Sequence, residues 1–237
     1  MTTKQPLQPF QIPLSVSLRD DARFENYYAQ GNELVCASLK AAASGDGEQF
    51  TYIWGSEGVG CTHLLQAVCH EADPVGRSAA YLPLDELKQM GGGILEGMEF
   101  LDLVCIDGIE SVAGNKAWEE ALFHFFNRIR EQGNTLIIAS TAAPRHLGIN
   151  LPDLASRLSW GMVFQVQALN DEVKLKAIKA KASARGLQFS DEVARFLLHH
   201  ASRNMNDLAC LLDTLDRASL SAQRKITIPF VKEVTGL

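Results

Sequence analysis

The residues best suited to chemistry lie in one short stretch, Gly55-Ser56-Glu57-Gly58-Val59-Gly60-Cys61-Thr62. It follows an apolar run at residues 50–54 and precedes a helical pattern that opens at His63. A strand, a glycine-rich loop and a helix in this order are typical of a phosphate-binding loop (P-loop), whose amides point at an anion. The P-loop pattern asks for lysine where this chain has Cys61. We therefore expect a loop that holds a diphosphate but stabilises a transferring phosphate poorly, in a protein with little hydrolytic activity of its own.

A second candidate is Asp107, which ends the nearly continuous apolar run of residues 101–107. Such a run predicts a buried parallel strand whose carboxylate lies at the C-terminal edge of the sheet, where nucleotides and metals bind. Asp107 could hold Mg²⁺ through water, with Thr62 supplying a hydroxyl. The alternative is a helix-capping or turn aspartate. Gly108 follows, so no adjacent second carboxylate can orient a hydrolytic water, and Glu110 is offset.

The elements that position these residues alternate between strand and helix patterns. Apolar runs predict strands near residues 50–54, 78–82, 101–107, 135–139 and 162–166. From Asn170 onward the pattern is wholly helical, with helices expected near 171–185, 190–201, 205–223 and from Pro229. The sequence therefore predicts an α/β fold, with a five-stranded parallel sheet flanked by helices and a small all-helical domain behind it.

Composition narrows the class of protein. The chain has 237 residues, 46% of them hydrophobic, which is enough for one compact domain and a smaller one. A net charge of −6 argues against a surface built mainly to hold nucleic acid. No apolar run approaches the roughly 20 residues that span a membrane, and no secretory signal opens the chain. Five scattered cysteines indicate reduced thiols, so we expect a cytoplasmic protein without zinc.

The N-terminal segment contains a short alternating pattern. Residues 1–20 lack helical periodicity, which predicts an extended tail. Within it, Gln11 precedes Ile12, Leu14 and Val16, which would share one face of an extended peptide and could enter a partner's groove. A strand folded back on its own domain is the alternative. Further along, the aromatic residues of 24–28 flank a nucleotide base or pack in the core.

Several motifs in order resemble one known family. The glycine loop, the strand ending in Asp107, the strand tipped by Ser140, the segment Ser156-Arg157-Leu158-Ser159-Trp160-Gly161 and the helical C-terminus resemble the AAA+ module of the replication initiator DnaA. Residues 151–158, 216–219 and 222–233 are similar to those of the Hda family of DnaA-homologous regulators. The resemblance covers essentially the whole chain.

The resemblance implies a three-part organisation. It comprises a tail at 1–20 that binds the sliding clamp, an AAA+ base at 21–168 and a helical lid at 169–237. The tail residues Gln11, Ile12, Leu14 and Val16 would bind the sliding clamp, the beta subunit of DNA polymerase III. Contact with DNA would be indirect, through the clamp, because the chain stops after the lid without an initiator's helix-turn-helix domain.

The resemblance also implies a role for Arg157. An AAA+ arginine at this position reaches the phosphate held by a neighbouring subunit, so Arg157 would act in trans on ATP bound to DnaA. The expected function is inhibition of DNA replication by regulatory inactivation of DnaA. The alternatives are an ordinary surface salt bridge for Arg157, a clamp-bound adaptor without a role in hydrolysis, and an independent weak P-loop ATPase. A homodimer could hide Arg157.

The ligand implied for this chain itself is ADP or another nucleoside diphosphate, with Mg²⁺ held through Thr62 and Asp107. Three departures from the AAA+ pattern agree with a diphosphate, namely Cys61, Gly108 and Asn206, each at a position where the family carries a group that handles a triphosphate. The expected nucleotide-binding residues are Phe24, Tyr28, Asn32, Gly58, Val59, Gly60, Cys61, Thr62, His63, Asp107 and Asn206.

Overall fold

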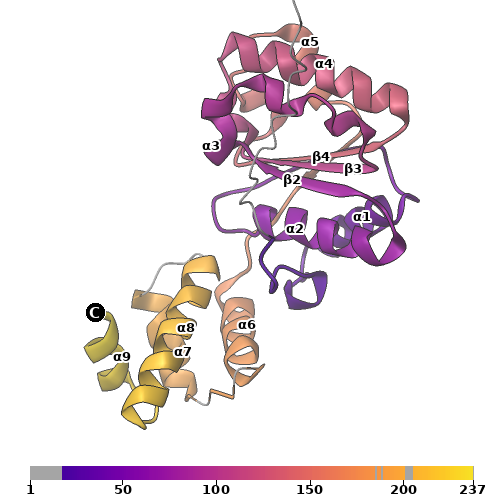
Figure 1. The fold of residues 1–237 in the computed structure, drawn as a ribbon. Coiled ribbons are helices and arrows are strands. Elements are labelled where there is room, and N and C mark those ends of the chain that lie inside the picture. Colours follow the sequence, from indigo (N-terminus) through magenta and orange to yellow (C-terminus); the bar gives the residue numbers. More distant parts are fainter. Residues whose placement is uncertain (1–17, 185, 188, 201–204, 237) are drawn as a thin grey trace, which may run out of the picture.

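The chain forms an α/β base and a helical lid, joined at residues 166–170 (Figure 1). The computed structural model describes residues 18–184, 186, 187, 189–200 and 205–236, without the side chains of residues 181, 184, 205–207 and 209. The clamp-binding tail predicted at Gln11, Ile12, Leu14 and Val16 lies outside the described residues.

The base is built on a five-stranded sheet with the strand order β2-β3-β4-β1-β5. Every pair of neighbouring strands is parallel, so the predicted five-stranded parallel sheet is confirmed. The strands are β1 (Phe50–Trp54), β2 (Ala79–Pro83), β3 (Leu103–Asp107), β4 (Thr135–Ser140) and β5 (Met162–Gln165).

Helices cover both faces of the sheet (Figure 1). One face carries α3 (Leu84–Leu87), α4 (Lys116–Gln132) and α5 (Pro152–Leu158), and the other carries α1 (Glu33–Ser44) and α2 (Cys61–Ala72). Short 3₁₀ turns lie at Phe24–Asn26, Asp73–Val75, Lys88–Met90, Gly92–Leu95, Met98–Phe100, Ile109–Val112 and Pro144–His146.

The two faces of the sheet belong to two separate cores because successive strand residues point in opposite directions. Tyr52 and Ile138 pack with Trp118 and Phe125 of α4, whereas Ile53 packs in the core on the α1 and α2 side. Both faces of each central strand are therefore apolar, as expected for a buried parallel sheet.

The first described residues lie against the base. Leu18 packs on the α1 and α2 core, and the backbone N–H of Arg19 donates to Gln66 Oε1 at 3.0 Å. Residues 18–20, which the sequence assigns to the tail, are thus held on α2.

The lid consists of helices α6 (Asp171–Ala184), α7 (Asp191–His200), α8 (Met205–Ala222) and α9 (Ile228–Thr235). Asn170 caps α6 by accepting from Val173 N at 2.9 Å, as the sequence predicts. The lid has an apolar core of its own, which includes Ile178, Leu212 and Phe230. No helix in the described part of the chain is long and apolar enough to cross a membrane.

Candidate functional site

The glycine loop joins β1 to α2 and depends on glycine at two positions. Gly58 and Gly60 have φ angles of +82° and +103°, in the left-handed region that favours glycine. A Cβ on Gly60 would also lie 2.7 Å from Cε2 of Tyr27, whose hydroxyl donates to the backbone oxygen of Val59 at 3.3 Å. Since α2 begins at Cys61 without a capping side chain, its first turn presents backbone N–H groups as anion donors.

A cavity of about 260 Å³ opens beside this loop at the carboxyl ends of β1, β3 and β4. It brings together five of the residues predicted for nucleotide binding. These are Gly58, Gly60, Cys61, Thr62 and Asp107. Other residues that line it are Gly55, Ser56, Glu57, Pro83, Asp85, Gly108, Glu110, Ser140 and Thr141.

Asp107 is held at the edge of this cavity by two hydroxyl groups. Tyr81 donates its hydroxyl to Asp107 Oδ2 at 2.7 Å, and Thr62 makes a side-chain hydrogen bond to the same carboxyl group. Burial raises the pKa of Asp107, these two hydrogen bonds oppose the rise, and Glu110 adds to it. The Thr62 hydroxyl and the Asp107 carboxylate are oxygen donors of the kind that Mg²⁺ prefers, so the residues fit that ion bound together with a nucleotide.

The cavity is acidic. The residues that line it include four carboxylates, Glu57, Asp85, Asp107 and Glu110, and no lysine, arginine or histidine. Burial, together with the charges of Asp107 and Glu110, raises the pKa of the Cys61 thiol to about 12, so Cys61 is neutral at physiological pH. Among the described residues that line the cavity, only backbone amides and hydroxyl groups are therefore available to a phosphate, so this lining supplies no countercharge.

Five predicted nucleotide-binding residues with described side chains do not line the cavity, and four of them lie in the glycine loop, at the start of α2 or before α1. Phe24 is 8% exposed and packs in the α1 and α2 core. His63 Nε2 lies 2.8 Å from the backbone oxygen of Arg23. Val59 and Tyr28 are partly buried outside the lining. Their arrangement holds the segment before α1 against the loop.

Asn32 joins the start of α1 to the end of the base. It is 1% exposed, its Nδ2 donates to the backbone oxygen of Gln167 at 3.0 Å, and its Oδ1 accepts from Gln167 N at 2.7 Å. Both ends of its amide are thus used inside the protein. Asn206 lies in α8, and its side chain is outside the described part of the structure.

Arg157 lies in the last turn of α5 and is partly exposed. Its guanidinium carbon is 5.8 Å from the ring centroid of Phe126 and 5.5 Å from that of Trp160. Among the described residues, Arg157 forms no ion pair. The surface salt bridge that the sequence left open as an alternative is therefore not formed with any described residue.

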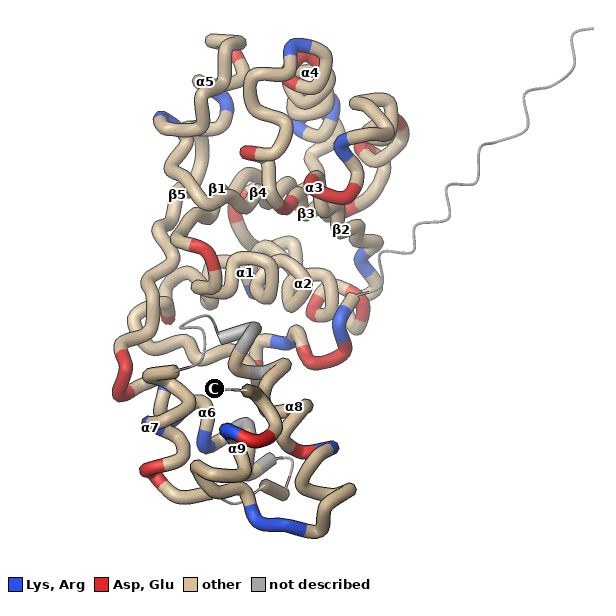
Figure 2. The backbone as a smooth tube through the Cα atoms, turned by 90° about the vertical axis from the view of Figure 1, so that its left-hand side faces the viewer, with Lys and Arg blue, Asp and Glu red and all other residues tan. Residues whose placement is uncertain are grey.

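The structure separates Arg157 from the P-loop. Gly161 follows Arg157 closely in the chain and lies against the sheet. A Cβ added to Gly161 would lie 2.4 Å from the backbone oxygen of Phe50, the first residue of β1. The P-loop follows Trp54, the last residue of the same strand. Arg157 thus lies near the N-terminal ends of the parallel strands, and the P-loop lies at their C-terminal ends. Figure 2 shows basic segments between α5 and β5 and an acidic segment at α3, the helix that contributes Asp85 to the cavity lining.

Solved structures share this architecture. Domain III of the Thermotoga maritima replication initiation protein DnaA superposes with a TM-score of 0.80 at 21% identity, covering 93% of this chain and 98% of that chain. AMPPCP-bound DnaA from Aquifex aeolicus gives a TM-score of 0.73 at 26% identity, covering 86% of this chain and 68% of that chain. The Thermotoga maritima RuvB branch migration motor shares the fold at 18% identity, with a TM-score of 0.69 and coverage of 91% and 71%.

Two family descriptions match the chain in succession. The bacterial DnaA ATPase domain matches residues 93–165, and the Hda lid domain matches residues 171–235. The chain is an Hda-like, DnaA-homologous AAA+ protein. The resemblance seen in the sequence is thereby confirmed, and so are the AAA+ base and the helical lid.

Glu119 is a residue of this Hda-like chain that sequence reasoning missed. It is 1% exposed, and its carboxylate accepts from Gly114 N at 2.7 Å, Asn150 N at 3.0 Å and Leu151 N at 2.8 Å. It therefore fixes the segment that leads into α5 and Arg157. The available signal was a carboxylate next to Trp118 in the otherwise apolar stripe of α4.

Tyr27 and Tyr81 were also missed as site residues. Both hydroxyl groups contact the phosphate-binding region, at Val59 and Asp107 respectively. Tyr81 could have been found from its place near the end of a strand that neighbours β3. Tyr27 belongs to the aromatic run upstream of the loop, and nothing in the sequence distinguishes one ring of that run from another.

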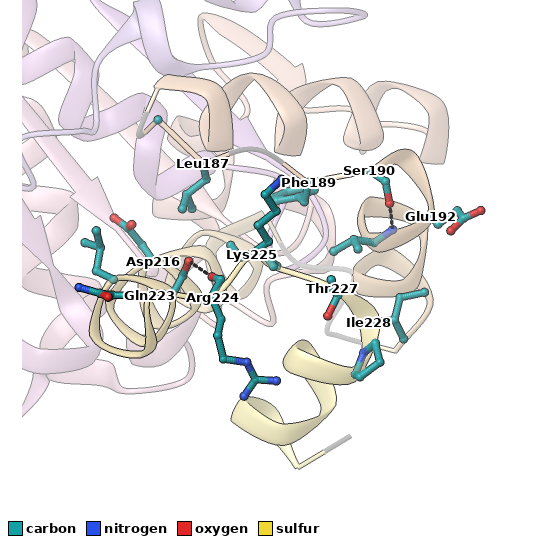
Figure 3. A pocket seen from close by; sticks show the side chains of 16 residues that line it. Leu187, Phe189, Ser190, Glu192, Asp216, Gln223, Arg224, Lys225, Thr227 and Ile228 are labelled. Carbon is teal, nitrogen blue, oxygen red and sulfur yellow. Dashed lines mark hydrogen bonds between the residues drawn. The ribbon is translucent and has the colours of Figure 1, made fainter.

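The Hda-like lid has a hollow of about 1110 Å³ formed by α7, the end of α8 and the start of α9 (Figure 3). Its charged residues include Arg224, which is paired with Glu233 at 2.9 Å. The glycine-loop cavity, with its amide donors and Asp107, is the better candidate for a nucleotide.

Proposed function

We propose that this Hda-like protein is a negative regulator of chromosomal replication initiation that stimulates hydrolysis of ATP bound to DnaA. The observation that carries the proposal is the position of Arg157. It is a partly exposed arginine without an ion pair among the described residues, at the sheet edge opposite its own P-loop.

The chemistry follows from this separation. Arg157 cannot serve the chain's own P-loop, so any phosphate that it contacts belongs to another molecule. A guanidinium presents a fork of donors that matches phosphate oxygens, and one supplied in trans accelerates phosphoryl transfer by about 10³–10⁵-fold. The likeness to an AMPPCP-bound DnaA supports a nucleotide on that partner. Arg157 of this chain would stabilise the negative charge that develops on the phosphate leaving the ATP of DnaA.

The chain's own cavity would hold ADP or another nucleoside diphosphate as a structural ligand. Amides of the glycine loop and the first turn of α2 would hold the phosphates, and Thr62 and Asp107 would hold Mg²⁺. The bound ion would neutralise the phosphates in a cavity that has four carboxylates and Cys61 in place of lysine. Mass spectrometry of the denatured protein would identify the copurifying nucleotide; a triphosphate in stoichiometric amount would contradict this assignment.

The tail would bring the protein to its place of action in the cytoplasm. Gln11, Ile12, Leu14 and Val16 would bind the polymerase III sliding clamp, so that DNA is approached only through the clamp. Tethering raises the effective concentration of the AAA+ base near DnaA. A homodimer could mask Arg157 and its release would then be a regulatory step.

The test is to locate the ATP that is hydrolysed. Labelled ATP is loaded on DnaA, and its hydrolysis is followed with this protein and clamp loaded on DNA, each alone and together. We expect fast hydrolysis only when all components are present, and no turnover of free ATP by this protein. Turnover without DnaA would favour an independent ATPase, and an unchanged rate on DnaA would favour an adaptor.

A further inference from the structure

Two arginines of the base share one tryptophan ring. Arg130 lies in the last turn of α4, and its guanidinium carbon is 5.5 Å from the ring centroid of Trp160. The guanidinium carbon of Arg157 is also 5.5 Å from that centroid. The two guanidinium groups therefore cannot be further apart than twice this distance, although α4 and α5 bring them from different parts of the chain.

Neither guanidinium is neutralised within the described structure. Among the described residues, Arg130 forms no ion pair, and neither does Arg157. Glu131 follows Arg130 in the chain, and Glu48 lines the same hollow as Arg130, but neither forms an ion pair with it. Two unpaired like charges repel each other, and water screens this repulsion only while the surface is free.

Trp160 is placed to hold both groups. Its side chain is 50% exposed, and it closes a hollow of about 180 Å³ that Phe50, Phe126 and Arg130 also line. Arginine stacks on aromatic faces, and stacking restricts the guanidinium without using its N–H donors. The N–H donors of both arginines therefore remain available to an incoming anion.

A single arginine at this end of α4 would have a simple explanation. Cations are favoured near helix C-termini, where backbone carbonyl groups lack partners. Arg157 also lies in the last turn of its helix, so this explanation applies to each arginine taken singly. It does not account for two guanidinium groups, brought by two helices, that share the ring of one tryptophan.

We propose that Arg130 is a second phosphate-contacting residue of the trans site, and that Trp160 is a positioning residue that spaces Arg130 and Arg157 around one phosphate. The inference rests on the proposed function, because it requires that Arg157 meets a nucleotide on a partner. A phosphate carries enough oxygens to accept from two arginine forks at once.

The test is hydrolysis of DnaA-bound ATP in the presence of loaded clamp. Arg130→Ala should lower the rate roughly ten- to hundredfold, as expected for loss of a hydrogen bond to a charged group. Arg130→Lys should recover only part of the rate, because lysine supplies a point charge without the fork. The matched control is Arg145→Ala, which removes an exposed arginine elsewhere on the base and should leave the rate unchanged.

Two further comparisons separate a phosphate contact from a structural role. Arg130→Ala and Arg157→Ala together should cost less than the product of their single effects, because both act on one phosphate. Arg130→Ala should weaken binding to ATP-loaded DnaA more than to ADP-loaded DnaA. For Trp160, Trp160→Phe should retain most of the activity that Trp160→Ala loses, while thermal unfolding of all variants stays cooperative.

The outcomes distinguish this inference from the proposed function. If Arg157→Ala abolishes stimulation and Arg130→Ala matches wild type, the second contact is wrong and the proposed function stands. Equal weakening toward ATP-loaded and ADP-loaded DnaA would overturn the phosphate contact. If neither arginine matters, the proposed function itself fails.

Discussion

Asp107 combines a role in the site with a cost to stability. Burial raises the pKa of its carboxyl group above the ordinary 3.8, so the folded state keeps the proton to a higher pH than the unfolded chain. The stability that protonated Asp107 contributes is therefore complete below pH 3.8 and is lost as the pH rises through the raised value. At neutral pH the buried charge destabilises the fold.

Asp107→Asn should accordingly raise the Tm at pH 7, and the gain should shrink as the pH falls toward the ordinary pKa of the carboxyl group. Thermal melts of the nucleotide-free protein in EDTA, followed by circular dichroism at several pH values, would measure this without the stabilisation that a bound ligand adds. Asp85→Asn is the matched control, because it also removes a carboxylate that lines this cavity. The side chain of Asp85 is 74% exposed, so its charge is not buried. A Tm at pH 7 that falls on Asp107→Asn would contradict this account of the site.

Cys61 should behave as an unreactive thiol. Its pKa is raised to about 12, and alkylation requires the thiolate. Iodoacetamide at pH 8 should therefore modify the exposed Cys210 well before Cys61, as peptide mapping by mass spectrometry would show. The Cys61→Ser variant should give the same early labelling pattern as wild type. Labelling of Cys61 as fast as Cys210 would be inconsistent with the burial described here.

The sequence was sufficient to find residues whose role depends on a local pattern. Gly60, Thr62 and Asp107 follow from the loop and strand patterns, and the cavity brings them together. It was insufficient for Asn32, because the partner that uses both ends of its amide is Gln167, 135 positions along the chain. Which polar side chains face a ligand and which join distant segments is decided by packing.

At the scale of elements, α5 is held by a buried carboxylate. Glu119 of α4 accepts hydrogen bonds from the backbone of Asn150 and Leu151, directly before α5 begins at Pro152. A carboxylate has two acceptor oxygens, so the Glu119 side chain can accept from all of these backbone N–H groups at once. The position of Arg157 at the other end of this short helix therefore depends on Glu119.

Glu119→Gln should lower the free energy of unfolding by roughly 2–4 kcal/mol, because the amide N–H₂ replaces an acceptor and faces backbone donors. Urea denaturation would measure the loss. The neighbouring Glu120→Gln is the matched control, since Glu120 pairs with Lys116 only at 3.8 Å on an exposed face, and its change should stay within about 0.5 kcal/mol. Equal effects at the two positions would refute the structural role of Glu119.

The predicted element types hold, and their bounds differ for identifiable reasons. The sequence predicts one strand over residues 101–107, but β3 begins at Leu103. Asp102 is withdrawn because its carboxylate accepts from Ser78 N at 2.8 Å and from Ser78 Oγ at 2.6 Å. The strand predicted at 78–82 is shifted to Ala79–Pro83, which a proline can end because β2 is an edge strand.

At the scale of the whole molecule, the strand order could not be predicted from the apolar runs alone. β1 lies between β4 and β5, so the P-loop that follows it is central, and Ser140 at the end of β4 lies directly beside Trp54. The structure supplies this arrangement, because an apolar strand does not specify its neighbours. The separation of Arg157 from the P-loop is a consequence of the same topology.

The tail should determine whether the molecule reaches the clamp. Gln11→Ala should reduce clamp binding roughly tenfold, through loss of hydrogen bonds that fix the register of the bound peptide. Retention on an immobilised clamp would be compared for wild type, Gln11→Ala and the control Gln8→Ala, which changes a glutamine of the same tail outside the alternating pattern. Fold and nucleotide content should not change. Identical retention of all three proteins would exclude this motif as the contact.

The most direct measurement of the central claim is single-turnover hydrolysis of ATP on DnaA, with clamp loaded on DNA and either wild-type protein or Arg157→Ala. The account predicts that Arg157→Ala reduces stimulation by about 10³-fold or more, while clamp binding and the Tm remain as in wild type. Arg145→Ala should stimulate as wild type does. Full stimulation by Arg157→Ala would contradict the claim that this arginine acts on the nucleotide of a partner.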